Sequence, residues 1–163
     1  MHIGDLDGAT LVVMDGLMFI GGGPAGTAGG VKITTAAVIF AVIAAEIRGR
    51  VHVSILGKTV APEVYRQAIA VVVLSAIFVG AATGILMILT DFSLEPLLFE
   101  SISAFATAGL STGITAKMTV AGQLILIVLM FVGRLGPILF ASALALRERP
   151  LLYELPAERP IIG

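Results

Sequence analysis

One stretch of the chain is long and apolar enough to cross a membrane as a single helix. Residues 68–89 carry no charged side chain and lie between Arg66 and Asp91, and a spanning helix needs about 20 apolar residues. Glycine and proline interrupt the other apolar stretches, and interrupted helices in membrane proteins mark ligand or ion pathways. Two discontinuous helices are therefore predicted. The first consists of residues 11–20 and 36–45 and is interrupted at 21–30. The second consists of residues 119–132 and 138–146 and is interrupted at 133–137.

A shorter amphipathic stretch, residues 93–106, predicts a helix that stops inside the membrane. Ser93 can cap it, and Glu95 and Pro96 are favoured in a first turn. About a dozen residues reach roughly 18–20 Å, which is about half of a membrane with its interface. The carbonyl end of such a helix carries partial negative charge, so it would favour a cation beyond it.

The polar, glycine-containing turn that follows, within residues 105–115 (FATAGLSTGIT), is the main functional candidate. Non-helical backbone at membrane depth is tolerated only where protein buries it or where it lines a water-filled cavity. Backbone carbonyls there can replace the hydration shell of a cation, as in an ion filter. A plain glycine turn between two helices is the alternative. The candidate filter residues are Thr107, Ala108, Gly109, Leu110 and Ser111.

Composition supports a multi-pass membrane protein. Of 163 residues, 58% are hydrophobic and 13% are charged, against about 45–50% and about 25% in soluble domains. The chain has no cysteine, which excludes disulfides and thiol chemistry. No basic stripe with aromatic residues suggests nucleic-acid binding, and no catalytic constellation suggests an enzyme. We therefore predict an all-α integral membrane protein built from a helix–pore-loop–helix repeat with discontinuous transmembrane helices, and with lipid as its surroundings.

Lysine and arginine predict the orientation, because cytoplasmic loops are enriched in both. Basic residues gather in residues 46–66 and near the C-terminus, whereas the N-terminus and residues 91–95 are acidic. The N-terminus is therefore expected outside and the C-terminus in the cytoplasm. The expected parts are a broken helix with an intramembrane loop (1–45), a cytoplasmic loop with a small hairpin (46–66), a complete helix–pore-loop–helix repeat (67–149) and a cytoplasmic tail (150–163).

An internal repeat extends this picture. Met18-Phe19 and Gly21 align with Met130-Phe131 and Gly133 at an offset of 112 residues, so both copies reach their helix break at the same register. Met1 then falls on Gly113, and an equivalent filter would lie just before residue 1. We expect the chain to be the C-terminal part of a longer repeat protein, holding the end of one repeat and the whole of the next.

The glycine-rich segment also fits a dinucleotide-binding pattern, G-x-G-x-x-G, in Gly21-Gly-Gly-Pro-Ala-Gly26, with Glu46 20 residues later. That motif needs a preceding strand and a parallel sheet, whereas the flanks here are membrane helices. A flexible hinge is a second alternative. A gate is favoured, because the segment is too rich in glycine to stay helical and lies below the candidate filter.

Four separated motifs together resemble the Trk/Ktr/HKT potassium transporter family, and the compact ending resembles its KtrB-like membrane subunits. They are the filter turn (106–115), the loop MFIGGGPAGTAGGVKITT (18–35), the break GRLGP (133–137) and the ending ERPIIG (158–163). The resemblance implies four pseudo-repeats around one potassium pathway, with K⁺ bound at Thr107, Ala108 and Gly109. The family's filter glycine corresponds to Gly109, and Ala108 stands where valine is common.

The resemblance also implies a gate and partners. Its gating loop corresponds to residues 21–32 and its arginine to Arg134. The implied partners are the remaining repeats of the full-length chain, a second copy in a homodimer, and a cytoplasmic KtrA/TrkA-like ring that binds nucleotide, which this chain would not bind. Na⁺ is implied as an activator and the plasma membrane as the location. The candidate gate residues are Gly21, Gly22, Gly23, Gly26, Gly29, Gly30, Lys32 and Arg134.

Several charged residues have more than one possible role. Lys32 either snorkels to water or repels potassium from a closed pathway. Arg134 either snorkels or, as favoured for a charge at membrane depth, bonds carbonyls of the 21–30 loop. Glu100 either faces water or, as favoured, braces backbone behind the filter. Asp15 is interpreted as facing an outer vestibule.

A different class of function also stays open. The fragment could be a non-conducting membrane scaffold or a truncated assembly piece, because one filter segment of four cannot surround an ion. Rescue of potassium-dependent growth by the full-length gene separates these readings.

Overall fold

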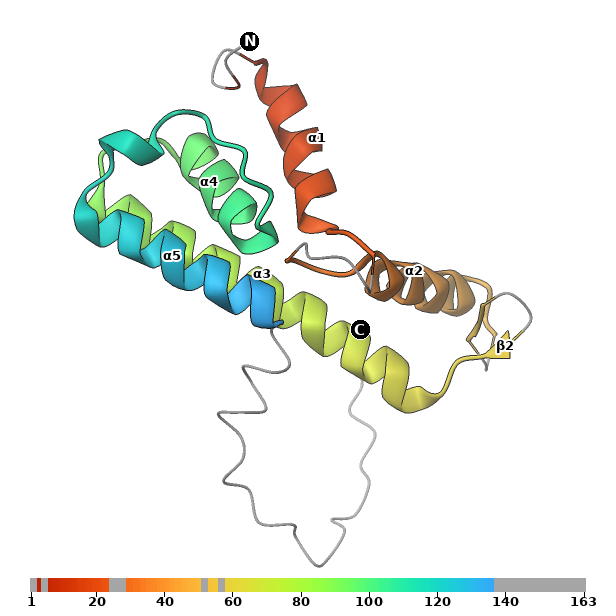
Figure 1. Ribbon diagram of the computed structural model, residues 1–163. Helices are drawn as coiled ribbons and strands as arrows, with labels where there is room; N and C mark the ends of the chain where they lie inside the picture. Colours follow the sequence, from red (N-terminus) through yellow and green to blue (C-terminus); the bar gives the residue numbers. More distant parts are fainter. Residues whose placement is uncertain (1–2, 4–5, 24–28, 51–52, 56–57, 137–163) are drawn as a thin grey trace, which may run out of the picture.

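The structure is a computed structural model that describes residues 3, 6–23, 29–50, 53–55 and 58–136. Figure 1 shows helices joined by loops of different lengths, with one very small hairpin. The all-helical prediction is confirmed apart from this hairpin, which the sequence also predicted. The helices and strands are α1 (Gly8–Phe19), α2 (Ile33–Ile47), β1 (Ser54–Ile55), β2 (Lys58–Thr59), α3 (Pro62–Leu89), α4 (Leu94–Ala106), the 3-10 turn η2 (Thr115–Lys117) and α5 (Val120–Leu135).

Helix α3 is the one described helix that is long and apolar enough to cross a membrane alone. It begins six residues before the predicted span, at Pro62, because proline is pre-organised for a first helical position and Glu63 suits the positive end of the helix. Its 28 residues span about 42 Å, which exceeds a hydrocarbon core of about 30 Å. The polar first turns therefore extend beyond the apolar span.

The predicted break of the first discontinuous helix is confirmed as a change of direction between α1 and α2. α1 ends at Phe19 and α2 begins at Ile33. Ile20 and Val31 form an isolated parallel bridge, in which Gly21 N–H donates to the Val31 carbonyl at 2.7 Å. The two ends of the glycine-rich segment are therefore held side by side.

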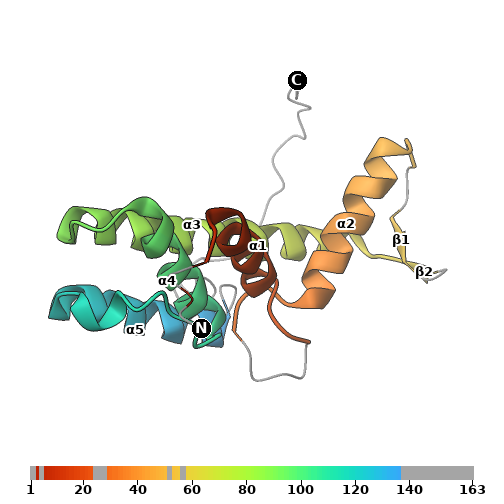
Figure 2. The ribbon, with the colours of Figure 1, turned by 90° about the horizontal axis from the view of Figure 1, so that it is seen from above.

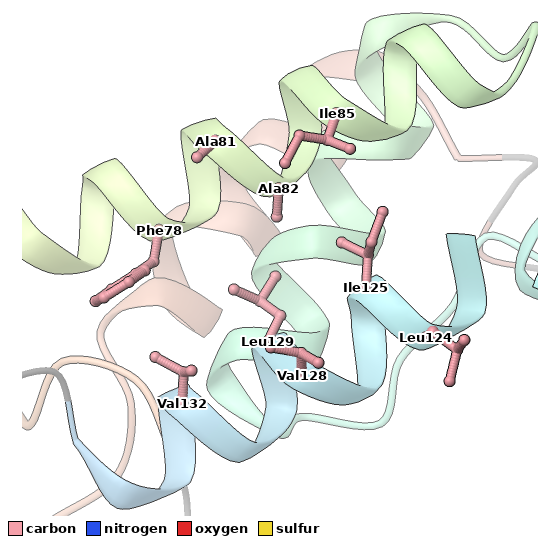
Figure 3. Close-up of a pocket in the computed structure, with 9 residues that line it drawn as sticks. All are labelled: Phe78, Ala81, Ala82, Ile85, Leu124, Ile125, Val128, Leu129 and Val132. Atoms are coloured by element: carbon pink, nitrogen blue, oxygen red, sulfur yellow. The ribbon is translucent and has the colours of Figure 1, made fainter. Parts of the chain in front are cut away.

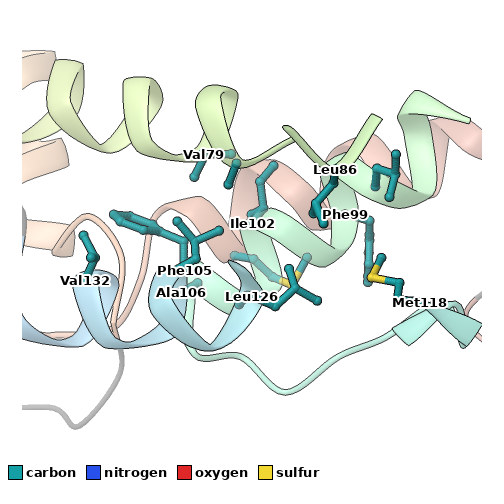
Figure 4. Close-up of a cluster of buried hydrophobic side chains, with 14 of the residues drawn as sticks. Val79, Leu86, Phe99, Ile102, Phe105, Ala106, Met118, Leu126 and Val132 are labelled. Carbon is teal, nitrogen blue, oxygen red and sulfur yellow. The ribbon is translucent and has the colours of Figure 1, made fainter. Parts of the chain in front are cut away.

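The short helix α4 is the centre of the molecule. It contacts α1, α3 and α5, and every residue from Phe99 to Ala106 is buried. Figure 4 shows its apolar side chains meeting those of α3 and α5, with Leu86, Phe99 and Phe105 fully enclosed. α3 and α5 run antiparallel beside one another, and α2 packs on α3 (Figure 2).

The ends of α4 and α5 lie close to the positions that the sequence predicts, but the hydrogen bonds that cap them agree only in part. Ser93 holds the N-cap position of α4 but makes no side-chain capping bond, so the predicted cap bond is wrong. Thr119 caps α5 by accepting from Gly122 N–H. α5 continues through Gly133 to Leu135 before Gly136 turns the chain at φ 87°. The predicted second half, residues 138–146, lies outside the described residues.

Candidate functional site

The segment after α4 leaves the helix through two left-handed residues. Thr107, at φ 52°, is the one non-glycine residue with positive φ in the described part of the chain, and Gly109 follows at φ 76°. The last helical carbonyls are used before the chain leaves, since Thr107 N–H donates to Ala104 and Ala108 N–H to Ser103. A left-handed threonine is strained, and such strain gathers at functional sites.

Three successive backbone carbonyls of this segment are free of hydrogen bonds. The oxygens of Thr107, Ala108 and Gly109 accept none from the residues that the structure describes. Thr107 is half-buried, and Ala108 and Gly109 are exposed. Free carbonyl oxygens on fixed backbone are the groups that can replace the hydration shell of a cation.

Ser103 fixes the segment from inside α4. Its hydroxyl donates to the Leu110 carbonyl at 2.5 Å and accepts from Leu110 N–H at 3.1 Å. Both backbone groups of Leu110 are therefore held by one side chain. The sequence reasoning missed this residue, and a serine seven residues before its partner gives no periodic signal that would reveal it.

Glu100 fixes the next part of the segment. Oε1 accepts from the Ser111 hydroxyl at 2.6 Å and from the N–H and hydroxyl of Thr112 at 2.8 and 3.0 Å, and Oε2 accepts from the Thr115 hydroxyl at 2.7 Å. The side chain is 4% exposed. These are bracing contacts, as the sequence favoured, and hydrogen bonds to a charged acceptor are stronger than neutral ones. Thr112 and Thr115 were not identified from sequence.

A cavity with several polar side chains in its lining lies behind the segment. It has a volume of about 370 Å³ and is bounded by α4, α5 and residues 107–115, with Glu100, Ser103 and Thr115 among its lining residues. A second cavity of about 370 Å³ lies between α3 and α5, and all its lining side chains are apolar (Figure 3). The second cavity offers no oxygen ligand and is not a candidate ion site.

The glycine-rich loop meets α4 at its C-terminal end, directly below Thr107. Gly29 N–H donates to the Thr107 hydroxyl at 2.9 Å and to the Ala106 carbonyl at 3.1 Å. A methyl group on Gly29 would lie 2.7 Å from the Phe105 carbonyl oxygen, and one on Gly133 would overlap that same oxygen. The loop, α4 and α5 therefore approach one another through bare backbone.

The other candidate gate residues are placed less closely together. Gly21 and Gly30 lie in the bridged neck of the loop and Gly22 accepts from Ile33 N–H, whereas Gly23 has open space around its Cα. Gly26 lies outside the described residues. Lys32 is half-buried beside the neck.

Arg134 is exposed on the last turn of α5. It makes no hydrogen bond with the described part of the 21–30 loop, so its predicted contact stays a prediction. Asp15 is 9% exposed and lines a cavity between α1 and α4, so its predicted place at an outer vestibule stays a prediction.

Fold and site together define a helical protein with one helix long and apolar enough to cross a membrane, in which a short buried helix ends at an extended, carbonyl-bearing segment. A family profile described as TrkH, cation transport protein, matches residues 1–148. The chain belongs to this family of cation transporters, which are proteins of the cell membrane.

Individual relatives support the same family assignment. Ktr system potassium uptake protein B of Vibrio alginolyticus is 37% identical over 153 residues, covering 94% of this chain and 33% of that protein. Ktr system potassium uptake protein D of Bacillus subtilis is 36% identical over 163 residues, covering 100% and 36%. Potassium/sodium uptake protein NtpJ of Enterococcus hirae is 30% identical over 166 residues, covering 95% and 36%. The chain spans about a third of the length of these relatives.

Proposed function

We propose that this chain is part of a potassium uptake pore and contributes one segment of its filter, residues 107–111. The observation that carries the proposal is the run of three unbonded carbonyls at Thr107, Ala108 and Gly109. Ser103 and Glu100 hold the following residues against a buried helix, so the carbonyls keep their positions without contacts of their own. Such pre-positioned oxygens can exchange with the water around K⁺.

Four such segments, one from each repeat, would surround the ion. This chain would provide the last, and the remaining repeats of the full-length protein would provide the others. The names of the relatives, potassium uptake protein B and D of a Ktr system, support potassium as the ion and a membrane subunit within a larger system. The homodimer, the nucleotide-binding ring and activation by Na⁺ stay predictions.

Gly109→Ala in the full-length transporter tests the filter. Alanine is strained at φ 76°, so relaxation of the backbone would move the three carbonyls. We expect reduced potassium uptake and loss of growth rescue at low potassium in a bacterium that lacks its own uptake systems.

Gly113→Ala is the matched control. Gly113 also has a positive φ, at 91°, and both glycines have open space around the added methyl group. The backbone strain is therefore similar, but Gly113 lies beyond the proposed filter. Equal loss of uptake in both variants, with equal amounts of protein in the membrane, would contradict the filter and favour the scaffold reading.

We also propose that residues 21–32 gate the pore. The position of Gly29 under Ala106 and Thr107 supports a loop that lies across the inner end of the filter. Deleting residues 24–29 should raise potassium flux through reconstituted transporter, and Arg134→Ala should weaken control of the closed state. Unchanged flux in both variants would reject the gate and leave the filter untouched.

A further inference from the structure

Two buried polar atoms lack a hydrogen-bond partner in the described part of the chain, and neither belongs to the filter or the loop. They are Asp15 Oδ1 in α1 and Ser101 Oγ in α4. Asp15 is 9% exposed and Ser101 is 0% exposed. Buried polar groups are nearly always satisfied, and a buried charge without a partner is especially costly. Two such groups in neighbouring helices therefore indicate that a further partner, which interacts with both, belongs between them.

The packing of α1 on α4 brings the two residues to the same depth. A methyl group on Gly8, at the start of α1, would lie 2.8 Å from Glu95 Oε1 in the first turn of α4. At the other end, the rings of Phe19 and Phe105 stack with centroids 6.4 Å apart. The helices are thus parallel. Asp15 follows Gly8 by seven residues and Ser101 follows Glu95 by six, which places them about 10 Å and about 9 Å along their helices.

Helical spacing also turns the two residues toward the same interface. Asp15 precedes Phe19 by four positions, and Ser101 precedes Phe105 by four. Residues four apart share one face of a helix, and the stacked rings show which faces meet. Asp15 and Ser101 therefore both lie on the facing sides of α1 and α4.

A cavity leads to this position from the N-terminal ends of both helices. It has a volume of about 600 Å³, and its lining includes Val12 and Asp15 of α1 and Glu95 and Leu98 of α4. Glu95 is exposed, so its carboxylate stays hydrated while drawing cations toward the opening. The cavity is roomy enough for water to complete the coordination of an ion.

We propose that α1 and α4 hold a monovalent cation between them, with Asp15 and Ser101 as ligands and Glu95 at the entrance. Carboxylate and hydroxyl oxygens are hard ligands that suit alkali and alkaline-earth cations. The single buried carboxylate balances one positive charge, whereas Ca²⁺ sites usually gather several carboxylates. This site shares no residue with the filter and stands even if the filter proposal fails.

The test uses purified full-length transporter in lipid nanodiscs, with the melting temperature followed as choline chloride is replaced by NaCl or by KCl at constant ionic strength. The protein also carries Gly109→Ala, which reduces ion binding at the proposed filter and therefore the part of the melting-temperature shift that the filter would cause. Ligands that bind the folded state raise the melting temperature in a concentration-dependent manner. We expect at least one of the two salts to do so, and the salt that acts identifies the cation.

Asp15→Asn should abolish this shift, and Ser101→Ala should raise the half-maximal salt concentration by about tenfold or more. Ser75→Ala is the matched control, because Ser75 is also fully buried but its hydroxyl is satisfied by the Val71 carbonyl at 2.7 Å. This control should leave the salt response unchanged. If Asp15→Asn does not fold, the comparison of Ser101→Ala with Ser75→Ala decides the matter.

Two results would overturn the proposal. The first is no shift with either salt in the Gly109→Ala protein. The second is an unchanged salt response in Asp15→Asn or Ser101→Ala.

Discussion

Single side chains of α4 shape the segment that follows it. Glu100 accepts four hydrogen bonds from three residues, and Ser103 holds both backbone groups of Leu110. The role of Glu100 was readable from sequence, because a carboxylate between apolar neighbours on a buried helix needs partners. The role of Ser103 was not readable, because a short hydroxyl side chain can bond to many groups and only the folded turn selects one.

Glu100→Gln should destabilise the segment. The amide keeps one acceptor oxygen but places a donor beside hydroxyls that now donate to Glu100, and each hydrogen bond to a charged group contributes roughly 1.5–3 kcal/mol. We expect a lower melting temperature of the full-length transporter and reduced potassium uptake. Glu63→Gln, at an exposed carboxylate in the first turn of α3, is the control: it should lower the melting temperature much less, because only a helix-end charge is lost, and should leave uptake unchanged. A wild-type melting temperature for Glu100→Gln would contradict the bracing role.

At the scale of elements, the sequence predicted which segments are helical better than where they end. The apolar runs and the glycine-rich interruptions revealed α1, α2, α3 and α5, because periodicity and breakers are local signals. The early start of α3 at Pro62 was missed, because its first turns are polar and hydropathy alone does not extend into them. The close crossing of α5 over α4 was also not predictable, since it depends on backbone contact between distant residues.

Gly133→Ala tests that crossing. The added methyl group would overlap the Phe105 carbonyl oxygen, and backbone cannot move aside as a flexible side chain can. Overpacking of this kind costs about 1–3 kcal/mol, so thermal unfolding should begin at a lower temperature and the end of α4 should shift.

Gly84→Ala provides the comparison for the crossing, because Gly84 lies in α3 with open space around its Cα. Alanine there should stabilise the helix slightly, by about 1 kcal/mol or less. Equal effects of the two substitutions would mean that α5 does not depend on close approach to α4.

At the scale of the whole molecule, the arrangement of helices around α4 could not be predicted from the sequence. The repeat at an offset of 112 residues related α1 to α5 in sequence, but it did not reveal that both pack on α4. The family assignment, by contrast, was accessible from sequence, because its motifs are short, ordered and rich in glycine. Membrane orientation rests on the distribution of lysine and arginine and remains a prediction.

Cysteine labelling tests this orientation in intact cells. The chain has no cysteine of its own, so within it a single introduced thiol reports one position. Lys117→Cys, on η2, should react with a membrane-impermeant thiol reagent added outside, and Arg50→Cys, after α2, should react only after permeabilisation. Both residues are exposed, so access to reagent is not limited by packing. The reverse pattern would invert the topology.

The hydrogen bonds of Gly29 connect the glycine-rich loop to the C-terminal end of α4. Its single N–H is shared between the Ala106 carbonyl and the Thr107 hydroxyl, so withdrawal of the loop would uncover two oxygen atoms at once. A dehydrated cation that leaves the carbonyl segment would then meet acceptors in place of a donor. The same movement of the loop would therefore open the passage and expose the oxygen atoms that coordinate the ion next.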